Sequence, residues 1–125
     1  MSSDIQAQPV ESPLSEAELA QLESTLLPAL ERHHLRLLAH GLRTLQTIAG
    51  RSEGPPPELG VIETWALAQP AISGDAGFAQ AFAGQLQSAG EQLSAIGASS
   101  GRSALAVGLD DLISWAKAQA DARLR

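Results

Sequence analysis

The sequence predicts an all-α fold, an irregular bundle of about four helices. Leucine and alanine supply most of the apolar residues, whereas the 125 residues include only two tryptophans, two phenylalanines and no tyrosine. This composition favours helices, because strands favour β-branched and aromatic side chains. Apolar residues also recur at three- and four-residue spacing, and no segment alternates as a strand would. We expect one helical domain over residues 15–125, preceded by a flexible polar tail over residues 1–14.

The first predicted helix begins at Ser15, which forms a capping-box pattern with Glu18. A leucine-rich helical pattern then continues to Gly50, a residue type that commonly ends helices. Pro28 interrupts this pattern, so we expect either a helix kinked at Pro28 or a short helix followed by a longer one. Unbroken, the helix would span about 50 Å at 1.5 Å per residue, which exceeds a compact domain of this length. That length favours a partner along the helix, either the rest of the chain or a second copy.

The remaining chain predicts three shorter helical segments joined by loops. Residues 58–69 form a helix that Pro70 ends, and residues 75–96 form a helix with Asp75 in its first turn. The glycine- and serine-rich residues 97–102 are expected to be a loop. Gly108 makes the start of the last helix ambiguous, so residues 103–108 are read as a possible separate turn before a helix over residues 109–123.

Charge is distributed unevenly along this acidic chain, whose net charge is −6. Residues 1–31 contain six acids and no Lys or Arg, whereas residues 32–51 contain four arginines and no acid. The order complements the helix dipole, which is one explanation for it. The overall acidity disfavours a nucleic-acid-binding function, since such proteins usually carry a basic surplus.

A polar stripe on the first helix is the main candidate for binding a partner or an anion. It consists of Arg32, Arg36, His40 and Arg43. Guanidinium groups suit carboxylates and phosphates, so an acidic partner fits this stripe, including the acidic N-terminal segment of a second chain in an antiparallel dimer. The alternative is an ordinary solvated helix face.

Beside the stripe, a helical wheel places a broad apolar arc made of Leu27, Leu30, Leu37, Leu38, Gly41, Leu45 and Ile48, widened by Leu35 and Leu42. His34 falls in the middle of this arc, and Glu31 falls between the directions of Leu38 and Leu42. Glu31 and His34 form a Glu-x-x-His pair, a spacing used in carboxylate-bridged di-iron bundles. The motif would need a second copy from a dimer, and Glu63 is a further candidate carboxylate ligand. The alternative is a core histidine satisfied by a neighbouring group.

Functional classes can be narrowed further from what the sequence lacks. There is no cysteine, the N-terminal residues do not resemble a signal peptide, and no apolar stretch is long enough to span a membrane. We find no catalytic motif and expect no cofactor. The sequence therefore favours a cytoplasmic, non-catalytic adaptor, assembly or protein-interaction module that acts as a homodimer. One alternative is a metal-binding protein that uses Glu31 and His34. A second alternative is a small-molecule-binding module, which no residue pattern in the sequence supports.

Overall fold

The computed structural model describes residues 14–124, and within that range the fold is all-α, as predicted. The α-helices are α2 (Glu16–Glu23), α3 (Ala29–Ala49), α4 (Leu59–Ala68), α5 (Ala76–Ser100) and α6 (Leu109–Leu124), with a 3-10 turn η2 (Ala104–Ala106). Most of the predicted tail lies outside the described residues. Its last residue, Leu14, is described, and its side chain packs in the core with 5% of its surface exposed.

The first predicted helix is divided at Pro28 into the short helix α2 and the longer α3. Ser15 caps α2 and forms the predicted capping box with Glu18. Because proline disfavours helical backbone in the residue before it, the chain leaves helical geometry before Pro28 and re-enters it at Ala29. Gly50 ends α3 in the left-handed conformation, with a φ of 70°, as its residue type indicated. The break means that no helix approaches the 50 Å of the unbroken alternative.

Helix α5, not the first helix, is the longest element of the described chain. It begins after Asp75, whose carboxylate accepts a hydrogen bond from the Phe78 amide, and it continues to Ser100. The expectation of a loop over residues 97–102 is therefore wrong for residues 97–100. Gly97 lies inside the helix at a point where the chain returns closely over it: a Cβ on Gly97 would lie 2.5 Å from the Arg102 carbonyl oxygen, so the position requires a glycine. Gly101, with a φ of 72°, provides the helix end instead.

The segment between α5 and α6 is a separate turn, one of the two predicted alternatives. Residues Ala104–Ala106 form η2, and the carboxylate of Asp111 in the first turn of α6 accepts a hydrogen bond from the Gly108 amide. The loop after α3 is fixed against this turn. The Gly54 amide donates to the Ser103 hydroxyl over 2.8 Å, and the Leu105 amide donates to the Gly54 carbonyl over 3.1 Å.

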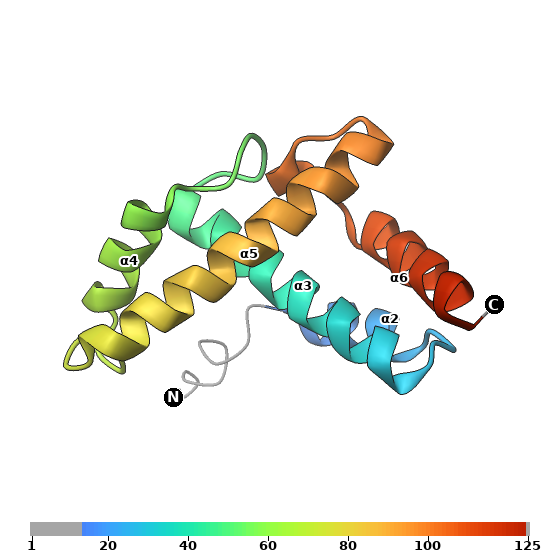
Figure 1. The fold of residues 1–125 in the computed structure, drawn as a ribbon, viewed down its shortest axis with the longest axis horizontal. Coiled ribbons are helices and arrows are strands. Elements are labelled where there is room, and N and C mark those ends of the chain that lie inside the picture. The colour runs from blue at the N-terminus through green and yellow to red at the C-terminus, as the bar shows by residue number, and fades with distance from the viewer. Residues whose placement is uncertain (1–13, 125) are drawn as a thin grey trace.

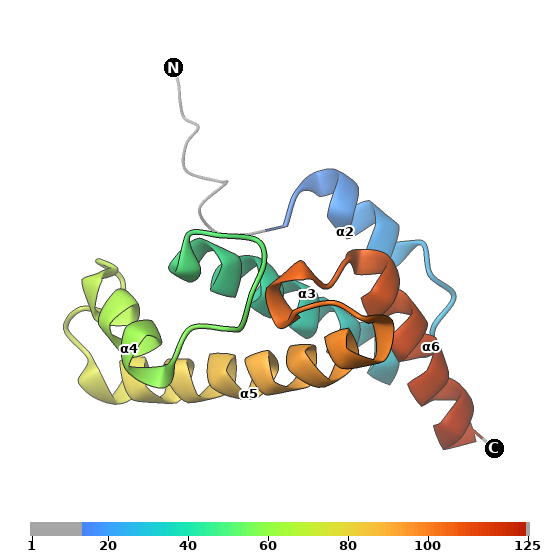
Figure 2. The same cartoon turned by 90° about the horizontal axis from the view of Figure 1, so that it is seen from above.

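The helices are arranged around α5, which runs along one side of the molecule (Figures 1 and 2). Helix α4 packs beside the first half of α5, α3 crosses its middle, and η2 folds back over its last turns. Helix α6 packs against α3, and α2 lies on the side of α3 away from α5. None of the helices of the described chain is long and apolar enough to cross a membrane.

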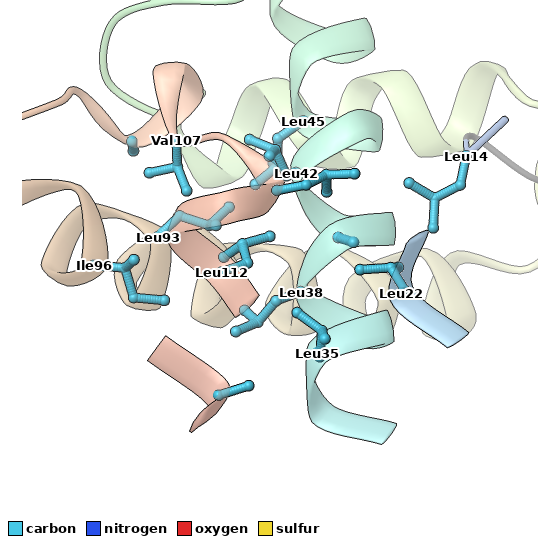
Figure 3. Close-up of a cluster of buried hydrophobic side chains, with 14 of the residues drawn as sticks. Leu14, Leu22, Leu35, Leu38, Leu42, Leu45, Leu93, Ile96, Val107 and Leu112 are labelled. Atoms are coloured by element: carbon cyan, nitrogen blue, oxygen red, sulfur yellow. The ribbon is translucent and has the colours of Figure 1, made fainter. Parts of the chain in front are cut away.

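The hydrophobic core surrounds α3 (Figure 3). Leu35, Leu42 and Leu45 of α3 are fully buried. Leucines of α5 and α6 approach them from one side, and Leu22 of α2 approaches from the other (Figure 3). A helix of eight residues is marginal by itself, so α2 depends on Leu22 and on its contacts with α3 for its structure.

Candidate functional site

The arginines of the predicted binding stripe pair with acids of the same chain. Arg43 donates from Nη2 and Nε to Oε2 of Glu18, over 2.6 and 3.2 Å. The other oxygen of Glu18 accepts the Ser15 amide of the capping box. The hydrogen bond from Arg43 lowers the pKa of Glu18 against the opposing effect of burial, and the Ser15 amide lowers it further. One carboxylate thus caps α2 and fastens it to α3.

A second acid of α2 engages the rest of the stripe. Arg36 donates to Glu23 over 2.6 Å, and Arg32 lies 4.0 Å from the same carboxylate. The acids of α2 and the arginines of α3, which form the abrupt change of charge in the sequence, therefore pair within one chain where α2 folds back on α3. An acidic segment does lie along the stripe, as the dimer hypothesis required, but it is α2 of the same chain and not a segment of a second copy.

His40 belongs to different surroundings from the three arginines. At 100° per residue it lies about 40–80° around α3 from the arginines, and it lines a groove between α3, α5 and α6. Burial lowers the pKa of His40, and the charge of Arg36 lowers it further, so the imidazole is neutral near pH 7. The predicted stripe is thus divided, because its three arginines pair with α2 whereas His40 lines the groove.

The candidate metal ligands are not brought together. Glu31 is engaged by Arg123, His34 is exposed on the surface of α3, and Glu63 belongs to α4 at the opposite end of the molecule from the first turn of α3 (Figure 1). Among residues 14–124 no three His, Asp or Glu side chains cluster as a metal site would require. The metal-binding alternative is therefore unsupported. The alternative of a core histidine is also wrong, because His34 is exposed although it falls in the middle of the apolar arc.

The uncovered part of α3 forms one wall of the groove, whose other walls are α5 and α6. Its volume is about 910 Å³. The lining residues from α3 are Leu30, Glu31, His34, Leu37, Leu38, His40, Gly41 and Thr44; those from α5 are Phe82, Gln85, Leu86, Ser88, Ala89 and Gln92; and those from α6 are Trp115, Gln119 and Arg123. We call this set the α3–α5–α6 groove.

Apolar side chains in the groove remain in contact with solvent. Leu30 and Leu37, both in the predicted arc, are 46% and 56% exposed. The ring of Phe82 continues the apolar surface along α5, since it stacks on Phe78 and on Trp65, each with a centroid separation of 6.2 Å. Contiguous exposed apolar surface of this kind usually marks an interaction site or a ligand groove.

The base of the groove is set by a close crossing of α3 and α5. A Cβ on Gly41 would lie 3.2 Å from the Cβ of Ala89, so the two backbones approach more closely here than larger residues would permit. The helices diverge on either side of this contact (Figure 1). The groove occupies one of these sides, where α6 provides the third wall.

A buried ion pair closes one end of the groove. Nε and Nη2 of Arg123 donate to the two carboxylate oxygens of Glu31, over 2.7 and 2.8 Å. Glu31 is 4% exposed, whereas the side chain of Arg123 is 44% exposed. The hydrogen bonds from Arg123 lower the pKa of Glu31 and outweigh the opposing effect of burial. The pair therefore joins the last turn of α6 to the first turn of α3 and holds Glu31 in its charged form.

Sequence reasoning did not identify Arg123, Gln85 or Gln119 as site residues. They are isolated polar positions on helices whose packing is set by residues far away in the sequence. Glu31 and Arg123 are 92 positions apart, and no local pattern links them. Trp115 of α6 also belongs to the groove wall.

Comparison with known proteins gives one finding. The sequence model of the family described as "NDH complex assembly factor CRR9" matches residues 14–123. No curated protein and no solved structure gives a significant match. The description agrees with the predicted role in assembly and with the expectation of a protein partner. The matched range contains every helix described above almost to its last residue, and the chain therefore belongs to the CRR9 family of NDH complex assembly factors.

Proposed function

We propose that this protein is a non-catalytic assembly factor for the NDH complex, and that it binds a protein component of that assembly in the α3–α5–α6 groove. The family match over residues 14–123 supports the assembly role. The observation that carries the choice of site is the exposed apolar surface of Leu30 and Leu37 on a helix whose other faces are packed or ion-paired. Such a surface is costly to leave in water and is typical of a docking site.

The chemistry of the groove supports binding rather than catalysis. Its two charged groups, Glu31 and Arg123, neutralise each other through two hydrogen bonds. The lowered pKa of Glu31 makes it a weak base, whereas a general base needs a pKa near the working pH. The remaining polar residues of the groove are histidines, amides and hydroxyls, which suit recognition of a protein surface.

Complementation of a deletion strain tests this function. The wild-type gene, a Leu37→Glu variant and a Leu67→Glu variant are expressed in cells lacking the protein, and assembled NDH complex is measured on native gels. Leu67 is an exposed leucine of α4 outside the groove and serves as the matched control. We expect the wild type and Leu67→Glu to restore the complex and Leu37→Glu to fail. A normal level of NDH complex in the deletion strain would refute the assembly role.

Homodimerisation and a cytoplasmic location stay predictions from the sequence. The exposed leucines of the groove are a surface on which a second copy could pack. Light scattering after gel filtration checks this, and a strict monomer at micromolar concentration would remove the dimer. Cell fractionation with an antibody to the protein checks the location.

A further inference from the structure

The shape of the groove indicates what kind of protein segment it receives. Its lining on α3 extends from Leu30 to Thr44, which is about 21 Å at 1.5 Å per residue. That is the length of a helix of about fourteen residues, or four turns. All three walls are themselves helices. The exposed leucines Leu30 and Leu37 lie on α3, and the partly buried rings of Phe82 and Trp115 lie on α5 and α6. Grooves of this type bind the apolar face of an amphipathic helix through side chains spaced three or four residues apart.

The charges of the groove indicate which flanking residue that helix carries. Glu31 is the only acid in the lining, and Arg123 neutralises it. His40 is neutral near pH 7 because its pKa is lowered. A chain with a net charge of −6 thus presents a groove without a free negative charge. A carboxylate on the incoming helix would contact Arg123, whose guanidinium has more donors than Glu31 uses.

The buried carboxylate of Glu31 fixes the orientation of Arg123. Glu31 uses Nε and Nη2 of the guanidinium, and the donors of Nη1 have no hydrogen-bond partner among residues 14–124. The side chain is 44% exposed and lines the groove. Because two hydrogen bonds fix its orientation, a bound carboxylate does not have to order a flexible arginine, and the loss of side-chain entropy on binding is smaller.

We propose that the α3–α5–α6 groove receives an amphipathic α-helix of an NDH assembly partner, with its apolar face on Leu30, Leu37 and Phe82 and a carboxylate on the free edge of Arg123. This proposal rests on the function proposed above and specifies its partner. Glu31 acts as the positioning residue. It does not contact the partner, but it directs Arg123 toward it.

Site-specific photocrosslinking in the full chain tests the helical partner. A benzophenone amino acid is placed at Gln85, an exposed groove residue, and as a control at Ser94, nine residues later and so on the opposite face of α5. Both proteins are expressed in cells that assemble the NDH complex, and crosslinked peptides are identified by mass spectrometry. We expect the Gln85 position alone to crosslink to an NDH subunit, in a segment with apolar residues at helical spacing and an acid beside them.

The contribution of Arg123 is measured with a synthetic peptide of the crosslinked segment. Its affinity for the full chain is compared with that of a peptide in which the acid is replaced by its amide. We expect about a tenfold weaker binding of the amide peptide to the wild type, as for a charge-assisted hydrogen bond, and no difference between the peptides on Arg123→Gln. The double variant Glu31→Gln/Arg123→Gln removes both charges together, so no buried carboxylate is left unpaired, and it should likewise not distinguish the peptides.

Several results would overturn the proposal. These are a Gln85 crosslink to a second copy of this chain, a crosslink to a segment without helical periodicity, or a peptide preference that persists without Arg123. Absence of any crosslink at Gln85, with NDH complex still missing in the deletion strain, would refute the groove as the docking site while leaving the assembly role intact. A normal NDH complex in that strain would instead refute the function itself.

Discussion

Two sides of α3 differ in how many of their side chains have partners within the chain. On one side Arg32, Arg36 and Arg43 are paired with carboxylates of α2. On the other, Leu30 and Leu37 face an open groove with about half of their surface in water. At 100° per residue the centres of the two sets lie about 130° apart around the helix. The arginines that stood out in the sequence thus join α3 to α2. The part of the apolar arc that contains Leu30 and Leu37, which resembled core, instead lies on the proposed binding surface.

This difference separates residues that stabilise the fold from residues that act on something else. The arginines of α3 pair with glutamates nearby in the sequence, because the break at Pro28 lets α2 fold back on α3. Apolar side chains compete for a limited covering surface. The remaining helices of the described chain cover the core side of α3 and leave the other side open. Mutations on the core side of α3 should therefore lower stability, whereas mutations on its groove side should weaken binding and leave stability nearly unchanged.

The largest contrast is expected between two leucines of α3. Leu42 is fully buried, so Leu42→Ala should lower the free energy of unfolding by about 2–5 kcal/mol through lost burial and a residual cavity. Leu37 is 56% exposed, so Leu37→Ala should change it by about 0.5 kcal/mol or less and instead weaken partner binding. Urea denaturation measures both variants. Equal destabilisation by the two would show that the groove side is covered.

Two glycines of α5 provide the next contrast. Gly97→Ala should destabilise the protein by about 1–3 kcal/mol, because the new methyl group would collide with the Arg102 carbonyl oxygen. Gly84→Ala serves as its control, since no atom of another element lies within 4 Å of the added Cβ. There the change should stabilise the helix by about 0.5–1 kcal/mol through reduced backbone entropy of the unfolded chain. Thermal unfolding should therefore shift in opposite directions, and a shared direction would contradict the close return of the chain over Gly97.

A smaller effect is expected at the ion pair between Glu18 and Arg43. Both side chains are still about a quarter exposed, which limits the contribution of the pair to about 1 kcal/mol. Because the pKa of Glu18 is lowered from its usual 4.5, the pair stabilises the fold fully above pH 4.5 and loses that effect as pH falls through the folded pKa. The stability difference between the wild type and Arg43→Gln should thus shrink as pH falls below 4.5. A difference that stays constant down to pH 2 would assign the effect of Arg43 to packing instead.

The smallest expected effect is at Glu23. Its carboxylate is about half exposed, as is its partner Arg36, so Glu23→Gln should cost only a few tenths of a kcal/mol at low salt. Screening by 1 M NaCl should remove even this difference. Guanidine is unsuitable as the denaturant because it is itself a salt, so urea titrations with and without NaCl give the measurement. A loss larger than that of Arg43→Gln would show that Glu23, rather than Glu18, fastens α2 to α3.

Local signals in the sequence determined most element boundaries. The capping box at Ser15, the break at Pro28 and the end of α3 at Gly50 each depend on the conformational preferences of a few neighbouring residues. The error in these boundaries, a loop expected over residues 97–102 where α5 continues to Ser100, also has a tertiary reason. Gly97 is present because the backbone passes close to it, and not because the helix ends there.

The sequence by itself thus determined that this protein is helical, where most of its helices begin and end, and that α3 carries an apolar arc too wide to ignore. Only the tertiary structure decided which part of that arc is buried, which acids the arginines contact, and that Glu31 pairs with Arg123 rather than with a metal. The physical reason is that helix formation depends on residues three or four positions apart, whereas covering one side of a helix depends on segments up to 92 positions away.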